Sequence, residues 1–158
     1  MRDEQGIFNQ RITKDGVYDL KLLISELKHW FEENEYDWEE LVNVTKEKDK
    51  GIEISSAFQG VKYVEDYYRR SIKVEMLITR VKKVAVKDMK LDQGKTEIII
   101  SSLLMTDYKN LYHSSIGEFF KKLKDNYIHF YEKKAQVGRL FVESQDLVAT
   151  LKHALGMP

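Results

Sequence analysis

The sequence contains no cysteine, and its single proline is the last of its 158 residues. Without cysteine it cannot form a disulfide, a thiolate nucleophile or a cysteine-ligated zinc or iron–sulfur site. It also lacks a run of about 18 uncharged apolar residues, so it predicts no membrane span. The first residues, MRDEQGIFNQR, are charged and contain no apolar segment. We therefore expect no signal peptide and a cytoplasmic location.

Motifs that carry a known chemistry are missing as well. The eight glycines lie too far apart to build a phosphate-binding loop. The four histidines form no H-x-x-x-H pair, and HSSIG lacks the first glycine of a G-x-S-x-G nucleophile elbow. The sequence thus identifies no catalytic residue, no metal ligand and no cofactor. It favours a binding protein over an enzyme, although an enzyme of unspecified reaction stays an alternative.

Composition and charge describe one globular domain over residues 1–158, because 42% of the residues are hydrophobic and 33% are charged. Positive and negative charges balance, but unevenly along the chain. Residues 1–60 hold 8 basic and 14 acidic side chains, whereas residues 61–95 hold 10 and 5. Opposite charges on separate segments are compatible with head-to-tail or two-fold self-association.

Helical periodicity marks both ends of the chain. Apolar residues recur at helical spacing over Tyr18–Glu33, and Asp19 or Asp15 can cap this helix. Ser115 and Glu118 match a capping box, which opens a second helical segment that extends to Tyr131. A third apolar stripe covers Leu140–Leu155.

Four strands are predicted between these helices, over Leu41–Glu47, Ile52–Phe58, residues 67–87 and Thr96–Met105. The third is longer than usual, and its alternation fails near Thr79–Lys83, which predicts a bulge. A loop is expected at residues 88–94. The fourth is apolar on both faces, which indicates a central strand covered by helices. The predicted fold is α+β, with an antiparallel four-stranded meander and one N-terminal and two C-terminal helices packed on one face.

The third strand, YYRRSIKVEMLITRVKKVAVK, is rich in basic residues. If Ile72, Val74, Met76 and Ile78 face the core, the basic residues that point the other way are Arg69, Lys73, Lys83 and Lys87. The strand could then bind a polyanion such as nucleic acid. Glu75 interrupts the basic row, and the acidic first third of the chain opposes a phosphate backbone. A solvated strand face is therefore favoured. The candidate basic residues are Arg69, Arg70, Lys73, Arg80, Lys82, Lys83 and Lys87.

A second alternative is a carrier of a small apolar ligand. A curved sheet closed by aromatic-rich helices can leave a cleft, and tyrosine suits the wall of such a cleft because its ring is apolar and its hydroxyl polar. The candidate lining is Met76, Phe120, Tyr127 and Tyr131. These side chains can equally fill the core at ordinary packing density.

Six carboxylates crowd the end of the first helix and the segment after it: Glu32, Glu33, Glu35, Asp37, Glu39 and Glu40. Hard cations prefer several oxygen ligands, but the segment lacks the ligand spacing and the glycine of a calcium loop. A solvated acidic surface is the favoured interpretation.

Two segments carry a resemblance to known proteins. Gly16–Leu20 with Leu27–Phe31, and later Leu123–Ile128, are similar to segments of a family of small uncharacterised archaeal proteins. That resemblance implies no activity and no site residue. The layout of a sheet with a C-terminal helix also resembles START-like ligand-binding domains, which begin with a strand and have more strands. A likeness of fold does not determine function.

Overall fold

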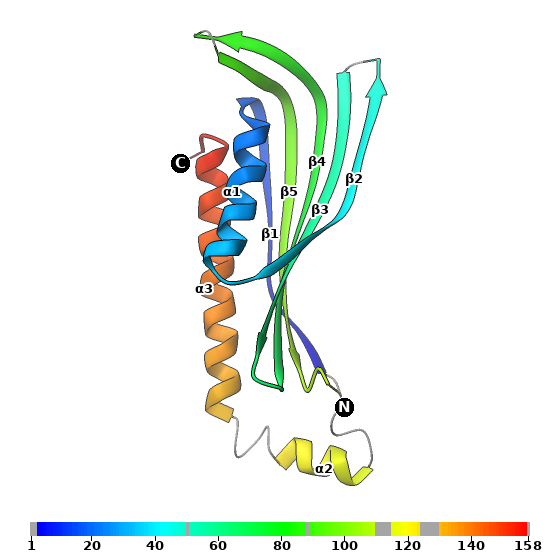
Figure 1. The fold of residues 1–158 in the computed structure, drawn as a ribbon, viewed down its shortest axis with the longest axis vertical. Coiled ribbons are helices and arrows are strands. Elements are labelled where there is room, and N and C mark those ends of the chain that lie inside the picture. The colour runs from blue at the N-terminus through cyan, green and yellow to red at the C-terminus, as the bar shows by residue number, and fades with distance from the viewer. Residues whose placement is uncertain (1–2, 50, 88, 110–114, 124–129, 158) are drawn as a thin grey trace.

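The computed structural model describes residues 3–49, 51–87, 89–109, 115–123 and 130–157 and has a helical layer against a long sheet (Figure 1). In chain order its elements are β1 (Asp3–Tyr18), α1 (Leu20–Glu33), β2 (Asp37–Lys48), β3 (Gly51–Val64), β4 (Tyr68–Val86), β5 (Met89–Thr106), α2 (Ser115–Leu123) and α3 (Phe130–Ala154). The α+β class, the antiparallel sheet and the three helices agree with the sequence prediction.

Among the described residues the sheet has five strands in the order β1-β5-β4-β3-β2, and all their pairings are antiparallel. The predicted meander is present as β2 to β5, but the predicted count of four strands is wrong because residues 3–18 form β1 beside β5. As an edge strand, β1 buries two side chains, Ile12 and Tyr18. It therefore needs no strict apolar alternation, which is the pattern that identifies a strand in a sequence.

The first helix starts at Leu20, two residues later than predicted, because Tyr18 ends β1. Asp19 is its N-cap, as expected, and the Asp19 Oδ1 accepts a hydrogen bond from the Leu22 amide at 3.1 Å. This carboxylate satisfies one of the free amides at the positive end of the helix dipole.

The predicted bulge in β4 is confirmed, since the pairing of β4 with β5 shifts between Thr79 and Lys82. The predicted loop over residues 88–94 is wrong. Strand β5 already begins at Met89, which pairs with Val86. At this end of the hairpin both strands are largely exposed, so backbone pairing continues without an apolar pattern to reveal it.

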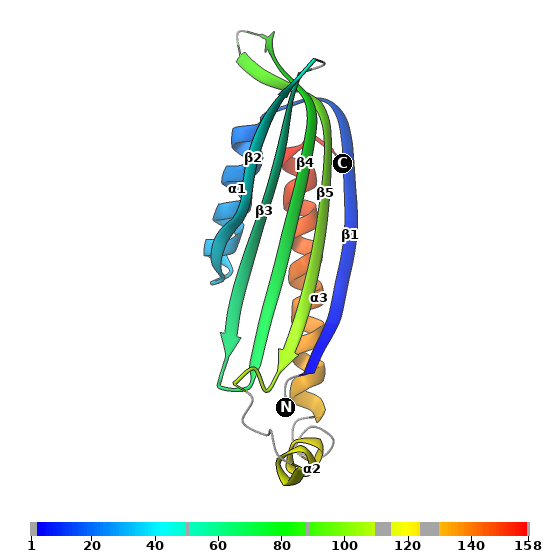
Figure 2. The ribbon, with the colours of Figure 1, turned by 90° about the vertical axis from the view of Figure 1, so that its right-hand side faces the viewer.

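Helices α1 and α3 cover one face of the sheet, here called the inner face, whereas α2 lies beyond one end of the sheet (Figures 1 and 2). The prediction that three helices pack on one face is therefore confirmed for α1 and α3 and wrong for α2. The inner face of the central strands is apolar, and Ile72, Val74, Met76, Ile98 and Ile100 are at most 3% exposed. They pack with leucines of both helices in one core.

None of the described helices covers the opposite face of the sheet, here called the helix-free face (Figure 2). On β5, Ile99 lies on this helix-free face and is half-buried, so the expectation of helices on both faces of this strand is wrong.

The inner face has no room for a side chain at Gly60. A Cβ on Gly60 of β3 would lie 2.4 Å from Cε1 of Phe31, whose side chain is fully buried.

Candidate functional site

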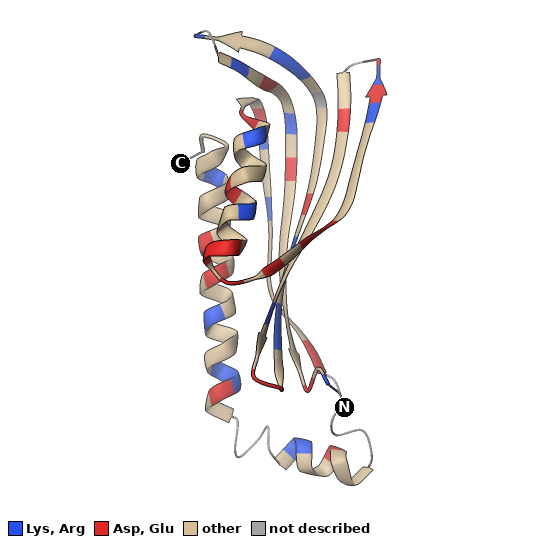
Figure 3. Cartoon of the chain, in the orientation of Figure 1, with Lys and Arg blue, Asp and Glu red and all other residues tan. Residues whose placement is uncertain are grey.

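The structure separates the seven basic residues that the sequence places on the third strand. Arg69 and Lys73 lie on the helix-free face, as predicted, where they line surface depressions. Lys82, Lys83 and Lys87 lie at the far end of the β4–β5 hairpin. The expectation that Lys83 points away from the core side is wrong, because the bulge after Thr79 changes the phase of the strand. Lys83 pairs at 2.8 Å with Asp92, which also accepts from the Leu20 amide of α1. The side chain of Arg80 is outside the described part of the chain. Figure 3 shows positive and negative residues interspersed along β4 and β5 rather than a continuous basic ribbon.

Arg70 does not belong to a basic surface. It shares the inner face with Ile72, is 4% exposed, and its Nη1 donates to Glu143 Oε1 of α3 at 3.1 Å. The hydroxyl of Tyr36 donates to the other oxygen of the same carboxylate. Glu143 therefore joins the sheet, the segment after α1 and α3. The alternation with Ile72 was the sequence signal that places Arg70 on the core side.

The same network changes the titration of Tyr36. Burial and the hydrogen bond to the Glu143 carboxylate raise the pKa of the Tyr36 hydroxyl above its ordinary value, because both disfavour the phenolate. In the unfolded chain this hydroxyl ionises near pH 10. The native state keeps it neutral, so its contribution to stability is complete below about pH 10 and is lost as the pH rises further.

We therefore expect the free energy of unfolding to fall more steeply above pH 10 in the wild type than in Tyr36→Phe. The difference in slope approaches about 1.4 kcal/mol per pH unit at most. Urea denaturation at several values between pH 8 and pH 11 measures it. The pKa of Tyr18 is also raised, mainly by burial, but Tyr18 is present in both proteins and cancels in the difference. Equal slopes would contradict the assignment to Tyr36.

The four residues predicted to line an apolar cleft are not brought together. Met76 is 3% exposed and packs in the core, and it also lines an open depression on the helix-free face. Phe120 of α2 and Tyr131 of α3 are instead 52% and 82% exposed. Tyr127 lies outside the described residues. The period of α2 does produce an amphipathic helix, but α2 lies beyond the end of the sheet and its apolar side faces solvent. Among these three described side chains there is thus no shared cavity.

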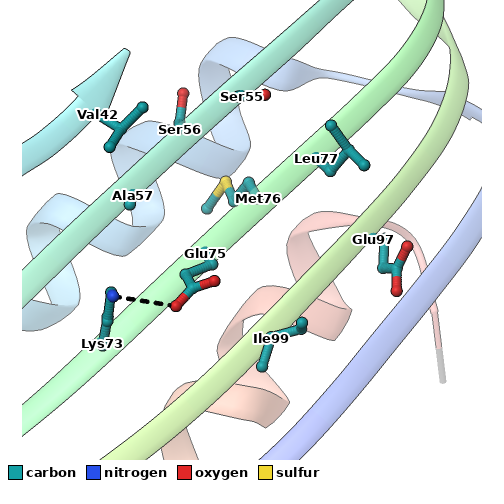
Figure 4. A pocket seen from close by; sticks show the side chains of 10 residues that line it. All are labelled: Val42, Ser55, Ser56, Ala57, Lys73, Glu75, Met76, Leu77, Glu97 and Ile99. Carbon is teal, nitrogen blue, oxygen red and sulfur yellow. Dashed lines mark ion pairs between the residues drawn. The ribbon is translucent and has the colours of Figure 1, made fainter. Parts of the chain in front are cut away.

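A groove that the sequence did not predict runs along the helix-free face. Three open depressions of about 420, 590 and 460 Å³ follow the outward side chains of β4 from Leu77 to Arg69. The first two share Lys73, and the third continues from the second along β4 and β5 (Figure 4 shows the first). We call this feature the β4 groove. Its principal lining residues are Val42, Ala57, Tyr63, Arg69, Ser71, Lys73, Glu75, Leu77, Glu97, Ile99, Leu103, Met105 and Tyr108.

The groove combines apolar side chains with paired charges. Lys73 and Glu75 form an ion pair at 3.1 Å, and Glu97 pairs with Arg11 of β1 at the same distance. Its remaining cation, Arg69, lies beside Tyr63 and Tyr108, whose ring centroids are 4.9 Å apart. The Arg69 Nε is buried and has no hydrogen-bond partner among the described residues. The groove therefore offers apolar contact along its length and a positive group at one end.

The sequence contained a partial signal for this groove. The stretch EIIISSLLM of β5 is apolar at alternate positions on both faces, which we read as burial under helices. The helix-free face instead leaves Ile99 and Leu103 half-buried beside polar neighbours. A period of two residues shows which side chains share a face but not what covers that face.

Within the described residues, no three His, Asp or Glu side chains lie in an arrangement that could hold a metal ion. The predicted acidic cluster around the end of α1 thus offers no metal centre in that part of the chain. None of the described helices is both long and apolar enough to cross a membrane.

Comparisons with known proteins do not assign a family. No protein-family model matches the chain, and no curated protein matches it. Among solved structures, an uncharacterized protein from Rhizobium leguminosarum shares 10% sequence identity over 97% of this chain and 99% of its own, with a TM-score of 0.22. A protein of unknown function from Staphylococcus aureus shares 9% over 99% and 98%, with a TM-score of 0.21. Likenesses this distant carry no functional argument.

Proposed function

We propose that the protein is a non-enzymatic cytoplasmic binding domain whose β4 groove holds an extended, partly apolar segment of a partner protein. The observation that carries this proposal is the row of three adjoining depressions on the one sheet face without helices. From Arg69 to Leu77 the groove follows eight residue steps of β4, roughly 27 Å. That length suits an extended peptide of about eight residues.

The open shape favours a peptide over a small ligand. Small-molecule sites typically enclose about 70–90% of the ligand surface, which requires a closed pocket. The β4 groove is open along its length, so a partner must obtain affinity from many shallow contacts. Exposed apolar side chains such as Leu77, which is 40% exposed, then supply the contact area, and the paired charges within the groove supply orientation.

The polyanion alternative has less support. The lining contains two cations, Arg69 and Lys73, and two anions, Glu75 and Glu97, so it is electrically neutral. Of the other predicted basic residues, Arg70 is buried against Glu143 and Lys83 pairs with Asp92. A phosphate backbone needs several free cations in a row, because counterion release drives its binding. A carboxylate of the bound segment beside Arg69 is the more suitable anion.

Selection of peptides from a displayed random library, followed by fluorescence anisotropy on the selected peptides, tests this proposal. We expect Leu77→Asp to weaken binding by about tenfold or more, since one desolvated apolar contact is worth about 1.4 kcal/mol or more. Arg69→Ala should weaken most the peptides that carry a carboxylate. Leu22→Asp is the matched control, because Leu22 is similarly exposed, at 45%, but lies on α1.

Two results would contradict the proposal. One is a library that yields no binder, and the other is a binder whose Kd is the same for wild type, Leu77→Asp and Arg69→Ala. Steeply salt-dependent binding of duplex or single-stranded nucleic acid that is lost in Arg69→Ala with Lys73→Ala would instead support the polyanion alternative.

A further inference from the structure

Strand β2 forms one edge of the sheet and is open to pairing. Its 12 residues pair with β3 along one side, and no strand of the described residues pairs with the other side (Figure 1). Eleven of the 12 are exposed, including Leu41, Val42 and Val44 at 42–43%. A long edge strand with apolar side chains and free backbone groups is a template for another strand.

A bulge in β2 arranges its charges by sign on one face. The pairing with β3 skips Leu41, so the alternation changes phase there. As a result the odd-numbered acids before the bulge and the even-numbered lysines after it lie on the same, helix-free side of β2. In order along the strand this row is Asp37, Glu39, Val42, Val44, Lys46 and Lys48. Figure 3 shows the acidic start of β2 and the lysines near its end.

This row is complementary to a reversed copy of itself. If two β2 strands pair antiparallel about a two-fold axis at Asn43, Val42 lies opposite Val44 of the copy. The bulged Leu41 takes no position in the ladder, which sets the partners of the residues before it. Glu39 then faces Lys46, and Asp37 faces Lys48. Each of these ion pairs occurs twice by symmetry.

The other residues agree with the same register. On the inner side, Glu40 faces Thr45 and Trp38 faces Glu47, so no like charges lie directly opposite. Moving the axis to Val44 brings Glu40 opposite Glu47 and removes the facing of Glu39 with Lys46. Moving it to Val42 places Glu39 opposite Val44. A two-fold axis placed between two residues would bring side chains of the inner face opposite side chains of the helix-free face, because successive side chains alternate between faces. Asn43 is therefore the favoured centre.

We propose that the protein self-associates through β2 into a two-fold dimer with a continuous ten-stranded antiparallel sheet, centred on Asn43. The occupant of the open edge is thus a second copy of this chain. The contact uses the sheet edge and shares only Val42 with the β4 groove. None of the test substitutions changes Val42, so each proposal can fail without the other. Lys48 already lies 2.8 Å from Glu53 of its own chain but stays 56% exposed, which leaves it able to face Asp37 of the copy.

Charge reversal at the two ends of β2 tests the register. We expect wild type to be dimeric at micromolar concentration in analytical ultracentrifugation. Lys46→Glu with Lys48→Glu makes the row wholly acidic, and Asp37→Lys with Glu39→Lys makes it wholly basic. Each should raise the Kd of the homodimer at least tenfold, and an equimolar mixture of the two should form a heterodimer. Lys133→Glu with Lys134→Glu on α3 is the control and should dimerise like the wild type.

The absence of cysteine allows a second test that does not alter charge. Two residues opposite each other across antiparallel strands have Cα atoms roughly 4.5–5.5 Å apart, which suits a disulfide. Asn43→Cys should therefore cross-link to its own copy under mild oxidation. In Thr45→Cys the two thiols would lie four residue steps apart, roughly 14 Å, and should stay reduced. Both positions are exposed, so access is matched.

Circular dichroism establishes that each variant is folded before association is measured. A wild type that is monomeric at the highest soluble concentration would overturn the proposal. So would a dimer that persists in both charge-reversed proteins, or cross-linking of Thr45→Cys as fast as that of Asn43→Cys. Heterodimer formation by the mixed variants together with selective cross-linking at residue 43 supports it.

Discussion

Glu143→Ala should lower the free energy of unfolding by about 3 kcal/mol, because it leaves the buried Arg70 guanidinium without its anion. The side chain of Arg70 is 5% exposed and that of Glu143 is 22% exposed, so the unpaired charge would have little access to water. The same change removes the acceptor of the Tyr36 hydroxyl. A buried group that loses its partner incurs the full cost of desolvation, whereas a satisfied pair contributes much less.

Arg70→Met combined with Glu143→Leu and Tyr36→Phe should recover most of this loss, to within about 1 kcal/mol of the wild type. Apolar residues of similar size often replace a buried ion pair at little cost, and Tyr36→Phe leaves no buried hydroxyl without an acceptor. Gln145→Ala is the control, because Gln145 is exposed on the same helix and should change stability by less than about 0.5 kcal/mol. Urea denaturation gives all three values. A combined variant no more stable than Glu143→Ala would show that the unpaired Arg70 and Tyr36 groups are not the source of the effect.

Gly60→Ala should destabilise the protein by about 3 kcal/mol, the upper end for an added methyl group in a packed core. The new Cβ would lie 2.4 and 2.5 Å from two ring carbons of Phe31, so the ring or the strand must move. Phe31 has no free space to enter, because it packs among Trp30, Tyr36 and the core leucines. The predicted cost of a side chain at Gly60 comes from steric overlap and not from backbone strain, since its φ is outside the left-handed region.

Gly138→Ala is the matched control. Gly138 lies in α3, where a Cβ would meet nothing within 4 Å, so alanine should stabilise the helix by about 0.5–1 kcal/mol through backbone entropy. Adding Phe31→Leu to Gly60→Ala should make the two changes non-additive, because the smaller side chain vacates the space that the Cβ needs. Thermal and urea denaturation measure both effects. Equal stability of Gly60→Ala and wild type would contradict the predicted clash.

The most secure sequence predictions were those that depend on local chemistry. Asp19 caps the first helix because a short carboxylate binds free amides wherever a helix begins. The bulge after Thr79 follows from the break in alternation within the strand itself. The meander of β2 to β5 follows from short connections between successive strands. For each of these, the residues that cause the feature are neighbours in the chain.

Features that depend on what covers a surface were decided by the tertiary structure. Periodicity placed Ile98 and Ile99 on opposite faces of β5, but only the position of α3 and α1 decides that one face is core and the other is groove. Strand β1 was not predicted, because it is held by backbone pairing with β5 and its sequence has no apolar alternation. Arg70 became part of the interior because α3, more than 70 residues later in the chain, presents Glu143 to it. A local sequence pattern cannot predict which side chain of a distant element will contact a given residue, because only tertiary packing brings the two together.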